Sequence, residues 1–74
     1  MMLIKKQIRF GILGCGVIAD YHAQAIKSLD NAELVGVADL NAERAAIFAE
    51  KYGVKSYPND RQMLDDPSID AVCI

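Results

Sequence analysis

Tryptophan is absent from this sequence, and aromatic residues make up only 7% of its 74 residues. Basic residues do not cluster beyond the pair Lys5-Lys6, and the net charge is −2, so no nucleic-acid-binding surface is expected. No apolar run reaches the roughly 18 residues that a membrane-spanning helix needs. The chain is long enough for one small domain, and its hydrophobic content of 53% suits a buried core.

Cysteine is limited to Cys15 and Cys73, which are too few for a disulfide framework and are expected to be free thiols. A secretory signal needs an apolar region of about 7–15 residues, whereas only residues 10–14 could form one before Cys15. We therefore expect a soluble, cytoplasmic protein whose partners include neither a membrane nor nucleic acid.

Hydrophobic periodicity predicts four strands, over residues 8–13, 33–39, 54–57 and 69–74, alternating with three helices. Short connections between strands and helices indicate a parallel sheet with right-handed crossovers. The predicted fold class is therefore α/β, a Rossmann-type β-α-β-α-β-α-β unit with the strand order 3-2-1-4.

The helices are predicted from their buried faces and end signals. The first is expected to begin at Val17 and to end at Asp30-Asn31, and its predicted buried face is Ile18, His22, Ala25/Ile26 and Leu29. The second is expected between the cap residues Asn41 and Gly53, and its predicted buried face is Ala42, Ala45/Ala46, Ala49 and Tyr52. The third, a short helix, follows a capping box in which Asn59 is the cap and Gln62 reaches back.

The connection between the first strand and the first helix carries the pattern G-x-G-x-x-A. Gly14 permits a tight turn, Gly16 lets the backbone approach an anion closely, and Ala19 keeps the helix near the strand. The backbone N–H groups of Gly16, Val17 and Ile18 are then expected to bind a pyrophosphate, helped by the helix dipole.

Asp39 ends the second strand, 20 residues after Ala19, where a carboxylate accepts hydrogen bonds from an adenosine ribose. A 2′-phosphate beside Asp39 would be repelled, and losing a charge-assisted hydrogen bond predicts roughly ten- to hundredfold preference for NAD over NADP. Leu40 and Asn41 supply no cation for a phosphate, which leaves Arg44 as the only residue nearby that softens this preference.

Several residues allow a purely structural interpretation. The glycines could serve packing alone, and Cys15 is expected to fill a tight space rather than to act in redox chemistry. His22 is expected to be a packed histidine rather than a catalyst. Asp39 could cap the turn that follows it, but Asn41 is better placed and is expected to leave Asp39 free. If the first and fourth strands are neighbours, Cys15 and Cys73 lie near their carboxyl ends, where geometry decides whether they can oxidise.

Taken in order, these residues resemble the N-terminal part of the glucose–fructose oxidoreductase / inositol dehydrogenase (Gfo/Idh/MocA) family. The resemblance extends from Ile8 to Ile74. It rests on Gly-Ile-Leu-Gly-Cys-Gly-Val-Ile-Ala with His22 following, Glu-Leu-Val-Gly-Val-Ala-Asp, Ala-Glu-Lys-Tyr-Gly-Val and Ile-Asp-Ala-Val-Cys-Ile. It implies pyrophosphate contacts at Gly14, Gly16, Val17 and Ile18, with Asp39 and Leu40 beside the adenosine ribose.

The resemblance also implies a two-domain NAD(P)-dependent oxidoreductase that transfers a hydride between a nicotinamide cofactor and a sugar, cyclitol or related polyol. Residues 1–74 would be the N-terminal part of its dinucleotide-binding domain. The remaining strands are absent from this chain, as is the substrate domain that mediates homo-oligomerisation. The family's Glu-Lys-Pro motif and its later Lys/Asp-x-x-x-His region are absent too, so no catalytic residue and no metal ligand is assigned, and the fragment alone is expected to be inactive.

Two alternatives use the same glycine turn and acidic residue. One is an S-adenosylmethionine-binding methyltransferase, although such sites commonly have another glycine where this chain has Ala19. The other is a non-catalytic NAD-binding scaffold or sensor built on the same fold.

Overall fold

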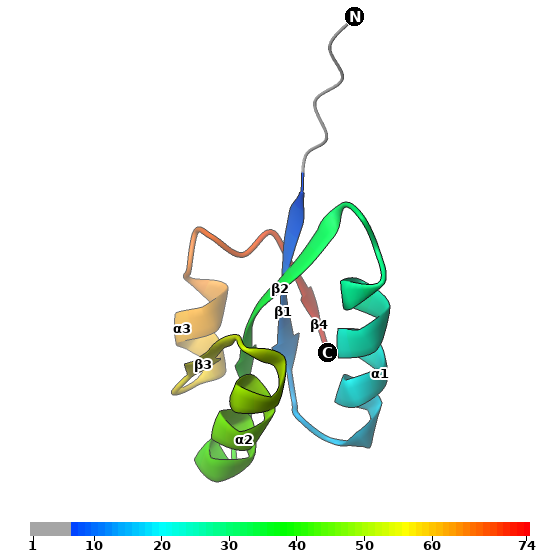
Figure 1. Ribbon diagram of the computed structural model, residues 1–74. Coiled ribbons are helices and arrows are strands. Elements are labelled where there is room, and N and C mark those ends of the chain that lie inside the picture. The colour runs from blue at the N-terminus through cyan, green and yellow to red at the C-terminus, as the bar shows by residue number, and fades with distance from the viewer. Residues whose placement is uncertain (1–6) are drawn as a thin grey trace, which may run out of the picture.

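A computed structural model describes residues 7–74 as strands and helices in strict alternation (Figure 1). The elements are β1 (Ile8–Leu13), α1 (Val17–Lys27), β2 (Ala32–Ala38), α2 (Ala42–Tyr52), β3 (Lys55–Tyr57), α3 (Asp60–Leu64) and β4 (Ala71–Cys73). Every strand pairing is parallel, and the order across the sheet is β3-β2-β1-β4. The predicted α/β, Rossmann-type topology is confirmed.

The end of α1 and the start of β3 differ from the prediction. In both places, hydrogen bonds between residues close in the sequence set the boundary. α1 ends at Lys27 rather than at Asp30-Asn31, since the N–H of Leu29 bonds to Ile26 O, three residues back, and the hydroxyl of Ser28 donates to Ala25 O. β3 starts one residue later than predicted, because the N–H of Val54 closes the end of α2 on Ala49 O at 2.9 Å.

The fourth strand also begins later than predicted, at Ala71 instead of Ile69. The N–H of Ile69 closes a turn on Asp66 O at 3.1 Å. Asp70 forms the junction with β1, where its N–H donates to Arg9 O at 2.7 Å and its carboxylate accepts from Arg9 N at 2.8 Å.

The predicted buried face of α1 is right for Ile26 and wrong for Ile18 and Leu29. The buried residues are Ala19, Ala23 and Ile26, whereas Ile18 and Leu29 are more than half exposed. His22 is half-buried, and Ala25 is exposed. The glycine turn brings the start of α1 close to the end of β1, and only a methyl group fits where helix and sheet approach most closely. Ala19 and Ala23 therefore face the sheet, whereas Ile18 and Leu29 remain outside.

The predicted face of α2 is right in part. Ala45 and Ala49 are buried and Tyr52 is half-buried, but Ala42 and Ala46 are exposed. Phe48 takes the remaining core position, and its ring lies 4.8 Å from that of Tyr52 between centroids. One large aromatic side chain, rather than a row of four alanines, fills the space between α2 and the sheet.

The predicted cap residues Asn41, Gly53 and Asn59 are confirmed. Asn41 Oδ1 accepts from Arg44 N at 3.0 Å, and Asn59 Oδ1 accepts from Gln62 N at 2.8 Å. Gly53 ends α2 with a φ of 67°, in the left-handed region that suits glycine.

The core is divided by the sheet, with α1 and α3 on opposite sides of it (Figure 1). The larger cluster packs α1 and α2 against one face, with Ile12 and Val37 at its centre. The smaller cluster consists of Ala38, Tyr57 and Met63, with half-buried neighbours. Within residues 7–74, no helix is long and apolar enough to cross a membrane.

Candidate functional site at the carboxyl ends of the strands

A cavity of about 680 Å³ opens where β1, β2 and β3 end. Parallel α/β sheets bind ligands at this edge, in the crevice outside the carboxyl ends of the strands. The lining residues come from the first glycine of the turn, the β2–α2 connection and the start of α3: Leu13, Gly14, Ala38, Asp39, Leu40, Asn41, Arg44, Pro58, Asn59 and Asp60.

The two glycines of the turn have different conformations. Gly14 has a φ of 89°, where a side chain would be strained, and its N–H donates to Ala38 O at 2.8 Å. Gly16 precedes α1 with φ −82° and ψ −166°, which any residue adopts. A Cβ built on either glycine would meet no protein atom within 4 Å. Packing inside the described chain therefore does not explain either glycine.

The start of α1 faces open space. Gly16 provides no side-chain cap, and the first N–H groups of a helix have no acceptor within that helix. The side chains of Val17 and Ile18 are 80% and 62% exposed. Ala19 is buried against the sheet, as the G-x-G-x-x-A pattern predicts. The arrangement offers N–H groups and the positive end of the helix dipole to an anion.

Asp39 links two of the three connections that border this cavity, those after β1 and β2. Its Oδ2 accepts from Cys15 N at 2.7 Å, and its Oδ1 accepts from Asn41 N at 2.7 Å. These two hydrogen bonds lower the pKa of Asp39, and the bond from Cys15 has the larger effect. The carboxylate is therefore charged at neutral pH. The expectation that Asn41 would leave Asp39 free is wrong, because Asp39 also closes the turn. Each carboxylate oxygen keeps a further lone pair for a ligand.

The neighbours of Asp39 differ in exposure. The side chain of Leu40 is fully exposed and makes a wall of the cavity. Asn41 uses its side-chain oxygen to cap α2. Arg44, in the first turn of that helix, is exposed, and its positive charge further lowers the pKa of Asp39.

Neither Cys15 nor His22 has the features of a reactive group. Cys15 is buried, and burial, followed by the charge of Asp39, raises its pKa to about 11. Both Cys15 and Cys73 are free thiols. The raised pKa of Cys15 slows the oxidation of that thiol, because the thiolate is the reactive form. His22 is half-buried and lines neither this cavity nor the second one.

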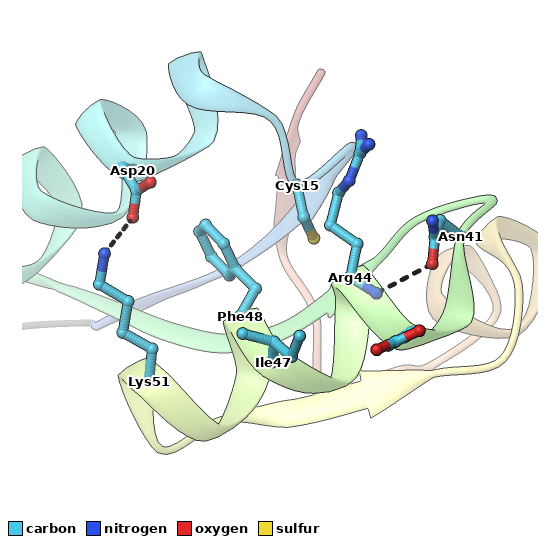
Figure 2. A pocket seen from close by; sticks show the side chains of 8 residues that line it. Cys15, Asp20, Asn41, Arg44, Ile47, Phe48 and Lys51 are labelled. Carbon is cyan, nitrogen blue, oxygen red and sulfur yellow. Dashed lines mark hydrogen bonds and ion pairs between the residues drawn. The ribbon is translucent and has the colours of Figure 1, made fainter.

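A second cavity, of about 390 Å³, lies between α1 and α2 (Figure 2). At one end, Asp20 Oδ1 accepts from Lys51 Nζ at 2.8 Å and from the hydroxyl of Tyr52 at 2.6 Å. At the other end, the side chain of Arg44 lies beside Cys15 (Figure 2). Asn41 and Arg44 line both cavities, so the two cavities meet at the start of α2.

Sequence reasoning missed that the connection between β3 and α3 contributes to the larger cavity. Pro58, Asn59 and Asp60 line the larger cavity, yet the sequence suggested only cap and strand-end roles for this segment. A signal was present, because the carboxyl ends of all strands in a parallel sheet meet at one edge. The connection after β3 therefore belongs with those after β1 and β2.

Comparison with known proteins identifies the family. The model of the Gfo/Idh/MocA oxidoreductase family, NAD-binding Rossmann fold, matches residues 8–74. Glucose-6-phosphate 3-dehydrogenase of Bacillus subtilis is 44% identical over 57 residues, which are 77% of this chain and 16% of that protein.

Two similar proteins have been solved with a nicotinamide cofactor. Myo-inositol dehydrogenase from Lactobacillus casei, solved with NAD(H) and myo-inositol, is 33% identical with a TM-score of 0.81, and the match covers 89% of this chain and 20% of that one. A 3-ketoreductase from Actinomadura kijaniata, solved with NADP and TDP-benzene, is 28% identical with a TM-score of 0.83, over 90% and 21% of the two chains.

The chain thus spans about a fifth of the length of these relatives. The matched region contains the glycine turn, Asp39 and all four strands described above. This chain belongs to the Gfo/Idh/MocA oxidoreductase family, and residues 8–74 correspond to its NAD-binding Rossmann fold.

Proposed function

We propose that this chain binds the ADP-ribose half of NAD, as the N-terminal part of the dinucleotide-binding domain of a dehydrogenase. The nicotinamide cofactor, when bound, supplies the hydride-transfer chemistry. The substrate class proposed for the parent protein is a sugar, cyclitol or related polyol, bound by a second domain that also mediates homo-oligomerisation. The residues of this chain bind and orient the cofactor, and none is assigned to catalysis.

The observation that carries this proposal is the position of Asp39 between the glycine turn and the start of α2. A pyrophosphate bound by the N–H groups of Gly16, Val17 and Ile18 places the attached ribose towards the end of β2. There the charged carboxylate of Asp39 accepts hydrogen bonds from ribose hydroxyls. Leu40, fully exposed beside it, gives the same cavity an apolar wall.

Two features of the glycine turn support the same proposal. A Cβ on Gly16 would meet no protein atom, so the space in front of α1 is available to a phosphate. Gly14 needs its positive φ to reverse the chain directly after β1. The family match argues against the methyltransferase alternative, because the matching family consists of oxidoreductases.

NAD is the proposed cofactor in preference to NADP. The hydrogen bonds from Cys15 and Asn41 keep Asp39 ionised, and an ionised carboxylate repels a 2′-phosphate. Members of the family are found with either cofactor, so the residues around the ribose decide which of the two cofactors is preferred.

Calorimetric titration of the chain with ADP-ribose tests this proposal, with S-adenosylmethionine as the comparison ligand. We expect one ADP-ribose to bind per chain and S-adenosylmethionine not to bind. The reverse result would support the methyltransferase alternative. For the parent protein, the coding sequence downstream of residue 74 should contain a Glu-Lys-Pro motif, and its absence would favour the non-catalytic scaffold or sensor.

A further inference from the structure

A largely apolar stripe runs along the outside of α1 and continues just past its C-cap. Side chains recur there at steps of three or four residues, at Ile18, His22, Ala25 and Leu29. This set is termed the outer stripe. Its apolar members are exposed, Ile18 by 62% and Leu29 by 53%, because α1 turns another side to the sheet. Single apolar side chains on a surface are common, whereas a continuous apolar stripe marks an interaction site.

The outer stripe faces away from α2. Asp20 and Lys27, the acidic and basic residues of α1, lie on its other flank. There Asp20 accepts from Lys51 and Tyr52 of α2, and Nζ of Lys27 lies 6.0 Å from the centroid of the Tyr52 ring. In the sheet order β3-β2-β1-β4, α2 packs on β3 and β2, and α1 packs on β2 and β1. The outer stripe is therefore on the side of β4.

The face of β4 on this side is incompletely buried as well. Ala71 pairs with Phe10 and Cys73 with Ile12, so these four side chains share one face of the sheet. Ile12 is at the centre of the larger core cluster, and Cys73 packs against the margin of that cluster. Ala71 and Cys73 are only half-buried. The core beneath α1 thus continues onto β4, where its cover is incomplete among residues 7–74.

Further β-α-β units would not complete this cover. The face on which a right-handed crossover places its helix depends on the direction in which the chain crosses the sheet. From β1 to β3 the chain moves one way, with α1 and α2 on one face, and it returns to β4 with α3 on the opposite face (Figure 1). A strand added beyond β4 continues in the direction of this return, so its helix would join α3. Because parallel sheets have both faces covered, a segment outside these units has to cover β4 beside α1.

We infer that the outer stripe and the adjoining face of β4 form a docking surface for an amphipathic helix from the second domain of the parent protein. The inference rests on the proposed function, which gives the parent protein that domain. This chain spans about a fifth of its relatives, so a parent of their length has ample sequence to supply the helix. Packed about 8–10 Å from α1, the helix would extend the layer of α2 and α1 across β4.

The chemistry of the surface describes the helix that fits it. The charged residues of α1 are directed towards α2, so the contact face of the docked helix should carry apolar residues at every third or fourth position. A second copy of this chain is a poorer fit, because pairing through α1 would cover the outer stripe and leave the face of β4 open. One added helix covers both.

Hydroxyl-radical footprinting of the full-length parent protein tests whether this surface is covered. Mass spectrometry measures the oxidation rate of Leu29 and of Ile47, each divided by its rate in the urea-unfolded protein. Ile47 is the matched control, because it is 62% exposed on α2, away from the docking surface. Leu29 should be at least about fivefold more protected than Ile47, since a residue under a packed helix loses nearly all of its exposure. Equal protection of the two residues would overturn the inference.

Photo-crosslinking in the same protein identifies what covers the surface. Leu29→p-benzoylphenylalanine should link to a helix of the same chain beyond residue 74, and Ala25→p-benzoylphenylalanine provides a second attachment point on the outer stripe. A link to another subunit would assign the surface to a second copy and overturn the inference. The proposed function fails separately, because a parent protein that does not bind ADP-ribose would overturn that function. A parent that binds ADP-ribose with Leu29 unprotected would overturn only the docking surface.

Discussion

The backbone N–H of Cys15 donates to the carboxylate of Asp39 at 2.7 Å, which ties the glycine turn to the end of β2. The second oxygen of Asp39 accepts from Asn41 N and so orders the start of α2. One side chain thus holds the connections after β1 and β2, which both border the larger cavity, in addition to its proposed contact with ribose. The acidic residue that follows the second strand therefore orders the candidate site.

Replacing Asp39 should therefore affect affinity and specificity together. Asp39→Ala should weaken ADP-ribose by roughly ten- to hundredfold, because charge-assisted hydrogen bonds to the ribose are lost and the glycine turn loses its anchor. The same variant should bind 2′-phospho-ADP-ribose nearly as well as ADP-ribose, because the repelling charge is gone. Calorimetry measures both constants. Unchanged discrimination in Asp39→Ala would remove this residue from its proposed role.

The two glycines of the turn should respond differently to alanine. Gly14→Ala forces a side chain into a positive φ and should lower the free energy of unfolding by about 1–3 kcal/mol. Gly16→Ala introduces neither strain nor a clash, so stability should change by less than about 0.5 kcal/mol. Its methyl group nevertheless occupies the space proposed for the pyrophosphate, and ADP-ribose binding should fall sharply. Urea unfolding and calorimetry separate the two effects, and a stable Gly16→Ala chain with wild-type affinity would contradict this pyrophosphate site.

The corrected buried face of α1 can be tested with two alanines on the same helix. Ala23 is completely buried against the sheet, and Ala23→Leu should cost about 1–3 kcal/mol of unfolding free energy through overpacking. Ala25 is exposed, and Ala25→Leu should change stability by less than about 0.5 kcal/mol. Urea unfolding provides both values. Equal costs at the two positions would mean that α1 faces the sheet differently.

Asp66 should contribute to stability in a pH-dependent way. The hydroxyl of Tyr57 and the backbone N–H of Ser68 donate to its carboxylate and lower its pKa to about 2. A carboxyl whose pKa is lower in the folded state stabilises the fold above its ordinary pKa, and this contribution is lost as the pH falls through about 2. Tyr57→Phe removes the largest cause of the shift, so the pKa of Asp66 should rise towards its ordinary value.

Carboxyl NMR titration measures the pKa of Asp66 directly, and urea midpoints between about pH 2 and 4 report the linked change in stability. The matched control is Tyr21→Phe, because the side chain of Tyr21 is largely exposed on α1. That variant should leave the titration of Asp66 unchanged. A low pKa that persists in Tyr57→Phe would assign the shift to Ser68 instead.

Much of the fold was predictable because its signals are local. Apolar segments followed by cap residues marked the strands and helices, and Asn41, Gly53 and Asn59 act as predicted. The alternation of strands and helices indicated a Rossmann-type fold, whose usual strand order is 3-2-1-4, and the structure has that order. The placement of Asp39 at a strand end could be predicted for the same reason, since it depends only on where the apolar run stops.

The sequence by itself therefore determined the parallel α/β topology, the glycine turn and the acidic residue that follows the second strand. The tertiary structure alone decided which face of α1 is buried, because the closeness of the sheet favours the small side chains of Ala19 and Ala23 over that of Ile18. It also decided that Asp39 bonds to Cys15, and that the side chain of Arg44 lies beside the glycine turn. These contacts join residues that are distant in the chain, and they exist only where the ends of neighbouring strands meet.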